Sequence, residues 1–372
     1  MALTEPPLAA FTDETPPESR ARNLALGAGA VILTVAFLVA GYVILADRTS
    51  PIPKPLITLL AIIWGVGGLL AVFTVSNWIV EQLPARAMRI LLPAVFIGPA
   101  VIFLFYFLLL PAIRTLSTSF FDQDGTVFVG LANYVRVFTN EATQLAFRNN
   151  LLWLAFGASL TVIMGLLIAA LADRSRFEVI AKSIIFMPVA ISLVGAGIIW
   201  KFVYAVRDPS SPQIGLLNAI WVGLGHSPIG WLADNQPFNN LFLIVVVVWL
   251  QTGFAMVLFS AAIKGVPADL LDAARVDGAN EIQTFTRVVV PTIMPTIIMV
   301  TTTIVIFTLK IFDVVVVLTN GNFGTQVIAT EFYTQFFSNR NFGLGSAIAI
   351  VLLILVLPVM VYNLRRFQQQ QA

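Results

Sequence analysis

The chain has 372 residues, of which 58% are hydrophobic and only 11% are charged. Soluble domains carry about 25% charged residues, so this composition indicates an integral membrane protein. The net charge of +2 comes without any basic run of the kind that follows phosphates, which excludes a nucleic-acid partner. The absence of cysteine excludes disulfides and thiolate metal sites. The single histidine, His226, excludes metal sites built from several histidines, and we expect it to be an exposed loop residue.

Apolar stretches of about 20 residues, each long enough to cross a hydrocarbon core, recur along the chain and predict helices rather than a barrel. We therefore expect an all-α polytopic membrane protein. Two accessory N-terminal helices are expected within residues 24–80, followed by a six-helix core over residues 90–372. Residues 1–23 are rich in proline and glutamate and show no signal-peptide pattern, which predicts a disordered tail. The eight predicted transmembrane helices cover about residues 24–46, 55–79, 90–112, 150–172, 183–200, 240–263, 289–318 and 344–364.

Both termini are expected on the same side of the membrane, because the number of predicted spans is even. The connections on that side hold more lysines and arginines than the connections on the other side. The positive-inside rule therefore predicts that both termini, and the loop between the sixth and seventh spans, are cytoplasmic.

This loop belongs to a charged segment, residues 264–288, that lies between two strongly apolar stretches. Pro267 suits the first turn of a short helix, and Gly278 readily adopts the left-handed geometry that ends one. Asn280 and Gln283 have the spacing of a capping box that begins a second helix. An interfacial helix bound to lipid favours a basic polar face, whereas acids predominate here, so we expect the segment to dock on a protein. The acids are Asp269, Asp272, Asp277 and Glu281, and the bases are Lys264, Arg275 and Arg287.

The run LDAARVDGANEIQTFTRVVVPTIMP resembles the EAA motif of binding-protein-dependent ABC importer permeases. Asp272 stands where that family usually has glutamate. In the family, this element is the coupling helix, which seats in a cleft of the ATPase subunit. The resemblance therefore implies ATPase-coupling roles for Asp272, Ala273, Ala274, Asp277, Gly278, Ala279 and Phe285.

The resemblance extends over roughly residues 90–372. Segments 128–140 and 309–325 resemble carbohydrate-uptake permeases, and 309–325 and 359–367 are similar to their α-glucoside and glucosylglycerol branch. The eight-helix count resembles the larger subunit of the maltose permease. This resemblance implies a bacterial inner-membrane subunit for a sugar such as glucosylglycerol, trehalose, sucrose or maltose. The implied partners are a second homologous permease subunit, two cytoplasmic ATPase subunits and an extracytoplasmic solute-binding protein.

No glycine in the chain is followed by lysine, so the chain cannot form a P-loop. The chain itself is therefore expected to be no enzyme and to hold no cofactor, with ATP and magnesium bound by the partner ATPases. A secondary transporter driven by an ion gradient is the first alternative, although it would need acids on several spans. A membrane scaffold without transport activity is the second alternative.

Lys310 and Asp313 are the charges that the predicted spans contain, and a charge at the centre of a span costs about 2.5–3.5 kcal/mol on insertion scales. Three residues apart in one helix, they are expected to share a face and pair, either as a structural brace or along the substrate path. Thr303 and Phe307 lie upstream on that face, and a hydroxyl, an aromatic ring and an ammonium group together suit a sugar. Gln251 and Thr252 in the preceding helix are further substrate candidates, with core packing as the alternative for Gln251. The six predicted substrate residues are thus Gln251, Thr252, Thr303, Phe307, Lys310 and Asp313.

Overall fold

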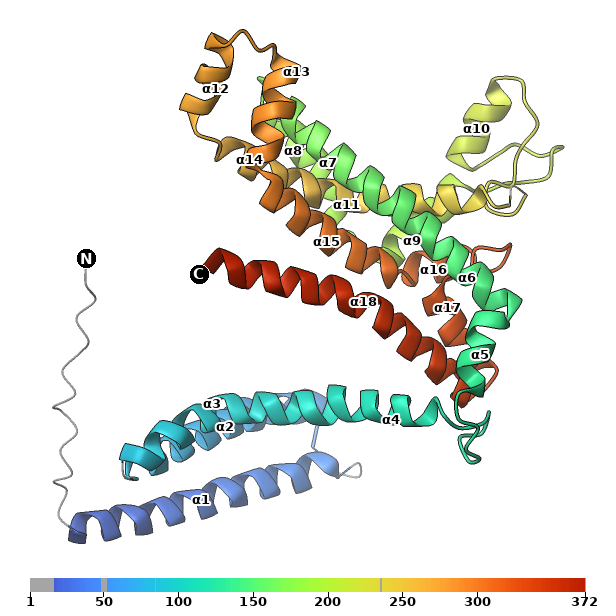
Figure 1. Cartoon of the computed structure of the whole chain (residues 1–372). Coiled ribbons are helices and arrows are strands. Elements are labelled where there is room, and N and C mark those ends of the chain that lie inside the picture. The colour runs from blue at the N-terminus through green and yellow to red at the C-terminus, as the bar shows by residue number, and fades with distance from the viewer. Residues whose placement is uncertain (1–16, 48–51, 84, 235, 372) are drawn as a thin grey trace. The chain divides into compact units, whose positions relative to one another are not determined.

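The computed structural model describes residues 17–47, 52–83, 85–234 and 236–371, which are almost entirely helical (Figure 1). These residues form no β-strand, and an isolated β-bridge joins Phe121 to Phe128. The predicted all-α fold is thereby confirmed. The chain forms two compact units, Met1–Ala112 and Ile113–Ala372. Of the tail predicted at 1–23, residues 1–16 lie outside the described residues, and a helix begins at Pro17.

The first unit consists of long apolar helices: α1 (Pro17–Ala46), α2 (Lys54–Glu81) and α3 (Ala85–Leu104), which continues into the π-helical turn η2 (Phe105–Leu109). The indole nitrogen of Trp64 on α2 donates a hydrogen bond to the Leu38 carbonyl on α1 at 3.1 Å. The rings of Phe73 and Phe96 stack between α2 and α3 with their centroids 5.8 Å apart. Many other large apolar side chains of this unit are exposed, as expected of helices that lipid surrounds.

The second unit contains the charged segment and a buried core. Helix α4 (Leu110–Thr118) leads into it. The remaining elements, in chain order, are α5 (Ala132–Thr139), α6 (Glu141–Leu152), η3 (Trp153–Ala158), α7 (Ser159–Ala172), α8 (Glu178–Phe186), η4 (Met187–Ala190), α9 (Leu193–Val203), α10 (Leu216–Gly223), α11 (Asn239–Lys264), α12 (Ala268–Val276), α13 (Glu281–Thr284), η5 (Phe285–Val289), α14 (Val290–Thr292), α15 (Met294–Leu309), α16 (Asp313–Leu318), α17 (Ile328–Tyr333), η6 (Thr334–Ser338) and α18 (Phe342–Gln371).

Helices α7 and α11 form the most extensive helix–helix contact of the second unit. A Cβ atom added to Gly165 on α7 would lie 2.5 Å from the Cβ of Ala255 on α11, so only glycine permits this approach. Around this contact, Met256, Phe259 and Ile304 are almost completely buried. Small residues at a helix contact are the usual means of packing helices within a membrane. The α7–α11 pair is thus closely packed, and the charged segment begins at the end of α11.

The expected number of spans agrees with the structure once two bends are allowed. Among the described residues, six helices are long and apolar enough to cross a membrane, and two bent helix pairs raise the number to eight if each pair is one span. One pair joins Glu178–Ala190 to Leu193–Val203 at 103°, where the Ser192 hydroxyl caps α9. The other joins Glu281–Thr292 to Met294–Leu309 at 73°, with the bend at Ile293.

The predicted continuous helix over residues 289–318 is wrong, because the chain leaves the helix at Lys310. Helix α15 ends at Leu309, Phe312 adopts φ −142° and ψ −59°, and α16 begins at Asp313. The helix dipole gives a physical reason, since a cation is favoured at a helix C-terminus and an anion at an N-terminus. Lys310 followed three residues later by Asp313 therefore suits the end of one helix and the beginning of the next.

Helices α6 and α16 lie at the end of the second unit opposite α12 (Figure 1). Buried asparagines of α6 donate hydrogen bonds to neighbouring segments there. The Asn149 amide donates to the carbonyls of Gly324 and Gln326, at 2.7 Å each. Nearby, the Asn150 amide donates to the Leu309 carbonyl at 3.2 Å. Because buried amides and carbonyls must be satisfied, these bonds fix the loop after α16 and the end of α15 against α6.

In the loop after α4, a carboxylate is held by backbone donors. The N–H groups of Val127 and Thr126 donate to Asp122 Oδ1 and hold the pKa of Asp122 below its ordinary value. The loop therefore has a defined local structure.

Candidate functional site

Helix α12 begins and ends where the local sequence predicts. Pro267 is its N-cap, and Gly278 ends it with a φ of +81°. The Gly278 N–H donates to the Arg275 carbonyl and the Ala279 N–H to the Ala274 carbonyl, both at 3.0 Å. These two bonds form a Schellman motif, in which a left-handed residue satisfies carbonyls at the helix end. The predicted break at Gly278 is confirmed.

The second short helix, α13, begins with the predicted capping box. The Asn280 side chain accepts from the Gln283 N–H, and the Gln283 side chain accepts from the Asn280 N–H, both at 2.9 Å. From α13 the chain continues through η5 and α14 to the bend at Ile293. The charged segment is therefore a helix–turn–helix with well-defined ends, which leads directly into α15.

One face of the charged segment is apolar and points into the protein. Leu271 and Phe285 pack against a buried cluster of Val266, Val289 and Ile293. Ala274 is buried as well. Of the predicted ATPase-coupling residues, Ala274 and Phe285 thus lie on the inner face, where they hold the segment in place. A partner surface would contact the other face.

The opposite face carries charged side chains next to two large apolar ones. Asp272 and Arg275 are exposed and form an ion pair at 2.9 Å. Val276 is 87% exposed and Ile282 is 75% exposed, on either side of Gly278. Exposed apolar side chains flanked by charges are typical of surfaces that dock another protein. The sequence prediction missed Val276 and Ile282, although isolated large apolar residues within a charged run were a usable signal.

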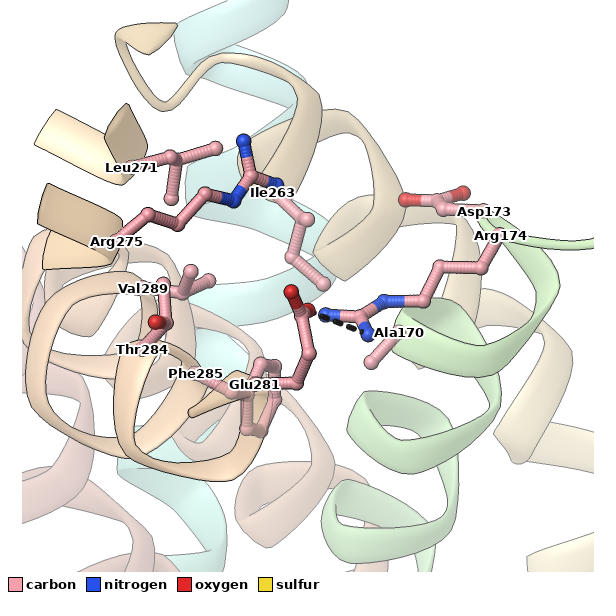
Figure 2. Close-up of a pocket in the computed structure, with 10 residues that line it drawn as sticks. All are labelled: Ala170, Asp173, Arg174, Ile263, Leu271, Arg275, Glu281, Thr284, Phe285 and Val289. Atoms are coloured by element: carbon pink, nitrogen blue, oxygen red, sulfur yellow. Dashed lines mark ion pairs between the residues drawn. The ribbon is translucent and has the colours of Figure 1, made fainter. Parts of the chain in front are cut away.

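A hollow of about 390 Å³ lies between the charged segment and the ends of α7 and α11 (Figure 2). Its wall combines apolar side chains, such as Phe285, with charged ones. Across it, Arg174 pairs with Glu281 at 2.7 Å, with both side chains more than half exposed. This ion pair joins the turn after α7 to the first residue of α13.

The predicted substrate residues of the seventh span are separated by the break after α15. Thr303 is exposed and donates its hydroxyl to the Met299 carbonyl at 2.9 Å, while Phe307 is half-buried against the core. Lys310 is exposed beyond the helix end, and Asp313 is half-buried as the first residue of α16. The ion pairs of the described residues do not include one between Lys310 and Asp313, so the predicted pairing on one helical face is wrong.

Gln251 and Thr252 lie in the middle of α11. Thr252 is buried and donates its hydroxyl to the Val248 carbonyl at 2.6 Å. Gln251 is half-buried, and its side chain makes no hydrogen bond within the described parts of the chain. Hydrogen bonds of the described residues do not link the six predicted substrate residues to one another. Their role in substrate binding stays a prediction.

Comparisons with known proteins agree with this architecture. Residues 161–370 match the family model described as "Binding-protein-dependent transport system inner membrane component". The chain is 53% identical over 276 residues to the osmoprotective compounds uptake permease protein GgtC of Synechocystis sp., covering 74% of this chain and 99% of that protein. It is 46% identical over 275 residues to the alpha-glucoside transport system permease protein AglF of Rhizobium meliloti, covering 73% of this chain and 81% of that protein.

Among solved structures, the fold is similar to a chain of a bacterial alginate ABC transporter in complex with an alginate pentasaccharide-bound periplasmic protein. The TM-score is 0.64 at 22% sequence identity, and the match covers 74% of this chain and 93% of that chain. At this identity the likeness concerns the fold alone, while the two permeases above extend it to the sequence. The chain belongs to the family of binding-protein-dependent transport system inner membrane components.

Proposed function

We propose that this permease subunit takes up an α-glucoside-like sugar or a sugar-based compatible solute, such as glucosylglycerol, trehalose, sucrose or maltose. The observation that carries the proposal is the 53% identity to a permease for osmoprotective compounds along nearly the whole length of that protein. The 46% identity to an alpha-glucoside permease supports the same class of solute. A glycosylated small molecule is the chemistry common to both.

The proposed complex contains this chain, a second homologous permease subunit, two cytoplasmic ATPases that bind ATP and magnesium, and an extracytoplasmic binding protein. The chain lies in a bacterial inner membrane with both termini in the cytoplasm. The exposed face of α12 and α13, with Asp272, Val276 and Ile282, docks on an ATPase. Closure of the ATPases then switches the bundle between inward-open and outward-open states around a site near the membrane midplane.

Helix α15 is the direct connection between the docking face and the proposed solute path. It follows the bend at Ile293, and its 16 residues span about 24 Å. Thr303 and Phe307 lie in its second half, four residues apart and so on one side of the helix, and Lys310 directly follows its last residue. A displacement of the charged segment would therefore move these side chains together.

The solute is tested on the cognate binding protein and on the assembled complex. Calorimetric titration of the binding protein with glucosylglycerol, trehalose, sucrose, maltose and a neutral amino acid identifies the ligand class. Proteoliposomes that contain both permease subunits and the ATPases should then take up the bound sugar. Tight binding and uptake of an amino acid, without binding of any of the sugars, would overturn the proposed solute class.

A further inference from the structure

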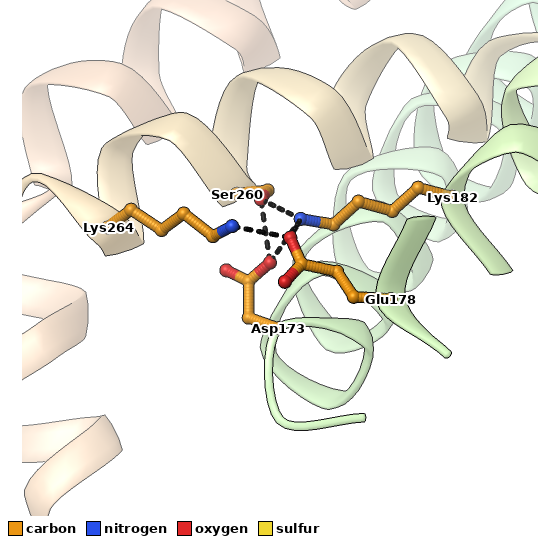
Figure 3. A network of polar contacts seen from close by, with 5 residues as sticks. All are labelled: Asp173, Glu178, Lys182, Ser260 and Lys264. Carbon is orange, nitrogen blue, oxygen red and sulfur yellow. Dashed lines mark hydrogen bonds and ion pairs between the residues drawn. The ribbon is translucent and has the colours of Figure 1, made fainter. Parts of the chain in front are cut away.

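The turn between α7 and α8 is fastened to the end of α11 by a network of charged side chains (Figure 3). Lys182 on α8 forms ion pairs with Asp173, which caps α7, and with Glu178. Glu178 also pairs with Lys264, the last residue of α11. The Ser260 hydroxyl on α11 donates to Asp173 Oδ1 at 2.7 Å. The network therefore joins the end of α7 and the beginning of α8 to the end of α11, which is distant along the chain.

The inner part of this network is poorly accessible to water. The side chains of Asp173 and Lys182 are only 9% and 17% exposed, whereas Lys264 at the outer edge is 54% exposed. Within the described chain, the second oxygen of Asp173, Oδ2, is buried and has no hydrogen-bond partner. A carboxylate in such a place depends on its paired cation, since an unpaired buried charge is strongly unfavourable. Asp173 and Lys182 therefore hold each other in place.

The same turn also forms an ion pair with the segment that follows α12 in the chain. Arg174, which directly follows Asp173, pairs with Glu281 at 2.7 Å. Glu178 pairs with Lys264, which precedes α12, and Arg174 pairs with Glu281, which follows it, so ion pairs from one turn reach both sides of this helix. Asp173 anchors the same turn to Ser260 of α11. We call Asp173, Arg174 and Glu178 the turn clamp.

We propose that the turn clamp is a positioning element that makes α7 and α8 move together with the charged segment when the ATPases close. The backbone attaches α12 directly only to α11 on one side and, through α13, to α15 on the other. Helices α7 and α8 are not adjacent to α12 in the chain. The ion pairs of the clamp connect them to the charged segment instead. The inference rests on the proposed function, because it assigns the path by which ATPase motion reaches the fourth and fifth spans.

The test uses variants that separate positioning from folding. Lys182→Met leaves Asp173 unpaired in a nearly buried place, which can impair folding. The double variant Arg174→Gln/Glu178→Gln removes the two ion pairs that reach either side of α12 and keeps the buried Asp173–Lys182 pair, so it is expected to fold while lacking these links of the clamp. Arg176→Gln is the matched control, since Arg176 is an exposed cation in the same turn and its side chain has no partner among the described residues. The readout is the amount of sugar imported per ATP hydrolysed in proteoliposomes of the complete complex.

We expect the double variant to assemble normally and to import at least about fivefold less sugar per ATP, the lower end of typical coupling between sites. Lys182→Arg, which keeps the buried cation, and Arg176→Gln should both leave the ratio unchanged. A double variant with the wild-type ratio would overturn the inference while leaving the proposed function intact. A wild-type complex that imports none of the proposed sugars would instead refute the proposed function.

A cross-link tests the same inference independently, because the chain has no natural cysteine. Arg174→Cys/Glu281→Cys removes one arm of the clamp, and a short bis-maleimide replaces it by a covalent link. If the turn and α13 move as one body, the linked protein should import as well as the wild type. Loss of import on cross-linking would show that the two elements must separate and would overturn the inference.

Discussion

Gly278 provides the most direct test of the helix–turn–helix. Its backbone conformation disfavours a residue with a Cβ atom, although the space around it would admit one. Its φ of +81° lies in the left-handed region, where a residue with a Cβ costs about 1–2 kcal/mol. A Cβ atom at this position would meet no heavy atom within 4 Å, so Gly278→Ala adds backbone strain without a clash. That strain corresponds to a factor of about 5–30 in the population of the native turn.

We therefore expect Gly278→Ala to weaken binding of the ATPase to the nanodisc-embedded permease by up to about 30-fold, and to lower import per ATP in parallel. Gly278→Asn is the matched control, since asparagine is larger than alanine yet adopts the left-handed conformation more readily. Biolayer interferometry and proteoliposome uptake measure the two effects. Wild-type binding by Gly278→Ala, or weaker binding by Gly278→Asn than by Gly278→Ala, would refute the assigned role of the backbone.

The other predictions concern packing, buried polar groups and the solute path. Gly165→Ala should destabilise the protein by about 1–3 kcal/mol through overpacking against α11, whereas Gly65→Ala meets open space and should not; equal thermal shifts would contradict this. Asn149→Ala should cost about 1–3 kcal/mol for each buried loop carbonyl that it leaves unpaired, and unchanged denaturant unfolding would contradict this. Lys310→Met should lower sugar uptake while leaving ATPase binding unchanged, and wild-type uptake would remove Lys310 from the path.

Features of the fold that depend on length and composition could be predicted from the sequence. The apolar stretches locate the spans because crossing a hydrocarbon core requires a nearly fixed number of residues. The bends at Ser192 and Ile293 could not be predicted in this way, since hydropathy averaged over a window carries no information on direction. The break after Leu309 had a local signal, a cation followed by an anion at the spacing of two helix ends. We interpreted that spacing as an ion pair on one helix. In the structure, Lys310 instead follows the end of α15 and Asp313 begins α16.

The charged segment shows the same division between local and tertiary information. Its helix ends were predictable because Pro267, Gly278 and the capping box of Asn280 and Gln283 act on their immediate neighbours. Which of its side chains face inward could not be predicted, because that depends on where α7 and α11 end. Phe285 packs inward for this reason, although the motif counts it among the coupling residues.

The dependence of import on ATP is the measurement that tests the central claim most directly. Proteoliposomes that contain this chain, its partner permease, the ATPases and the solute-loaded binding protein are assayed with ATP present or absent, and with a protonophore. The proposed mechanism predicts that import requires ATP and the ATPases and continues when the proton gradient is collapsed. Import that persists without ATP and stops with the protonophore would contradict it and favour a secondary transporter.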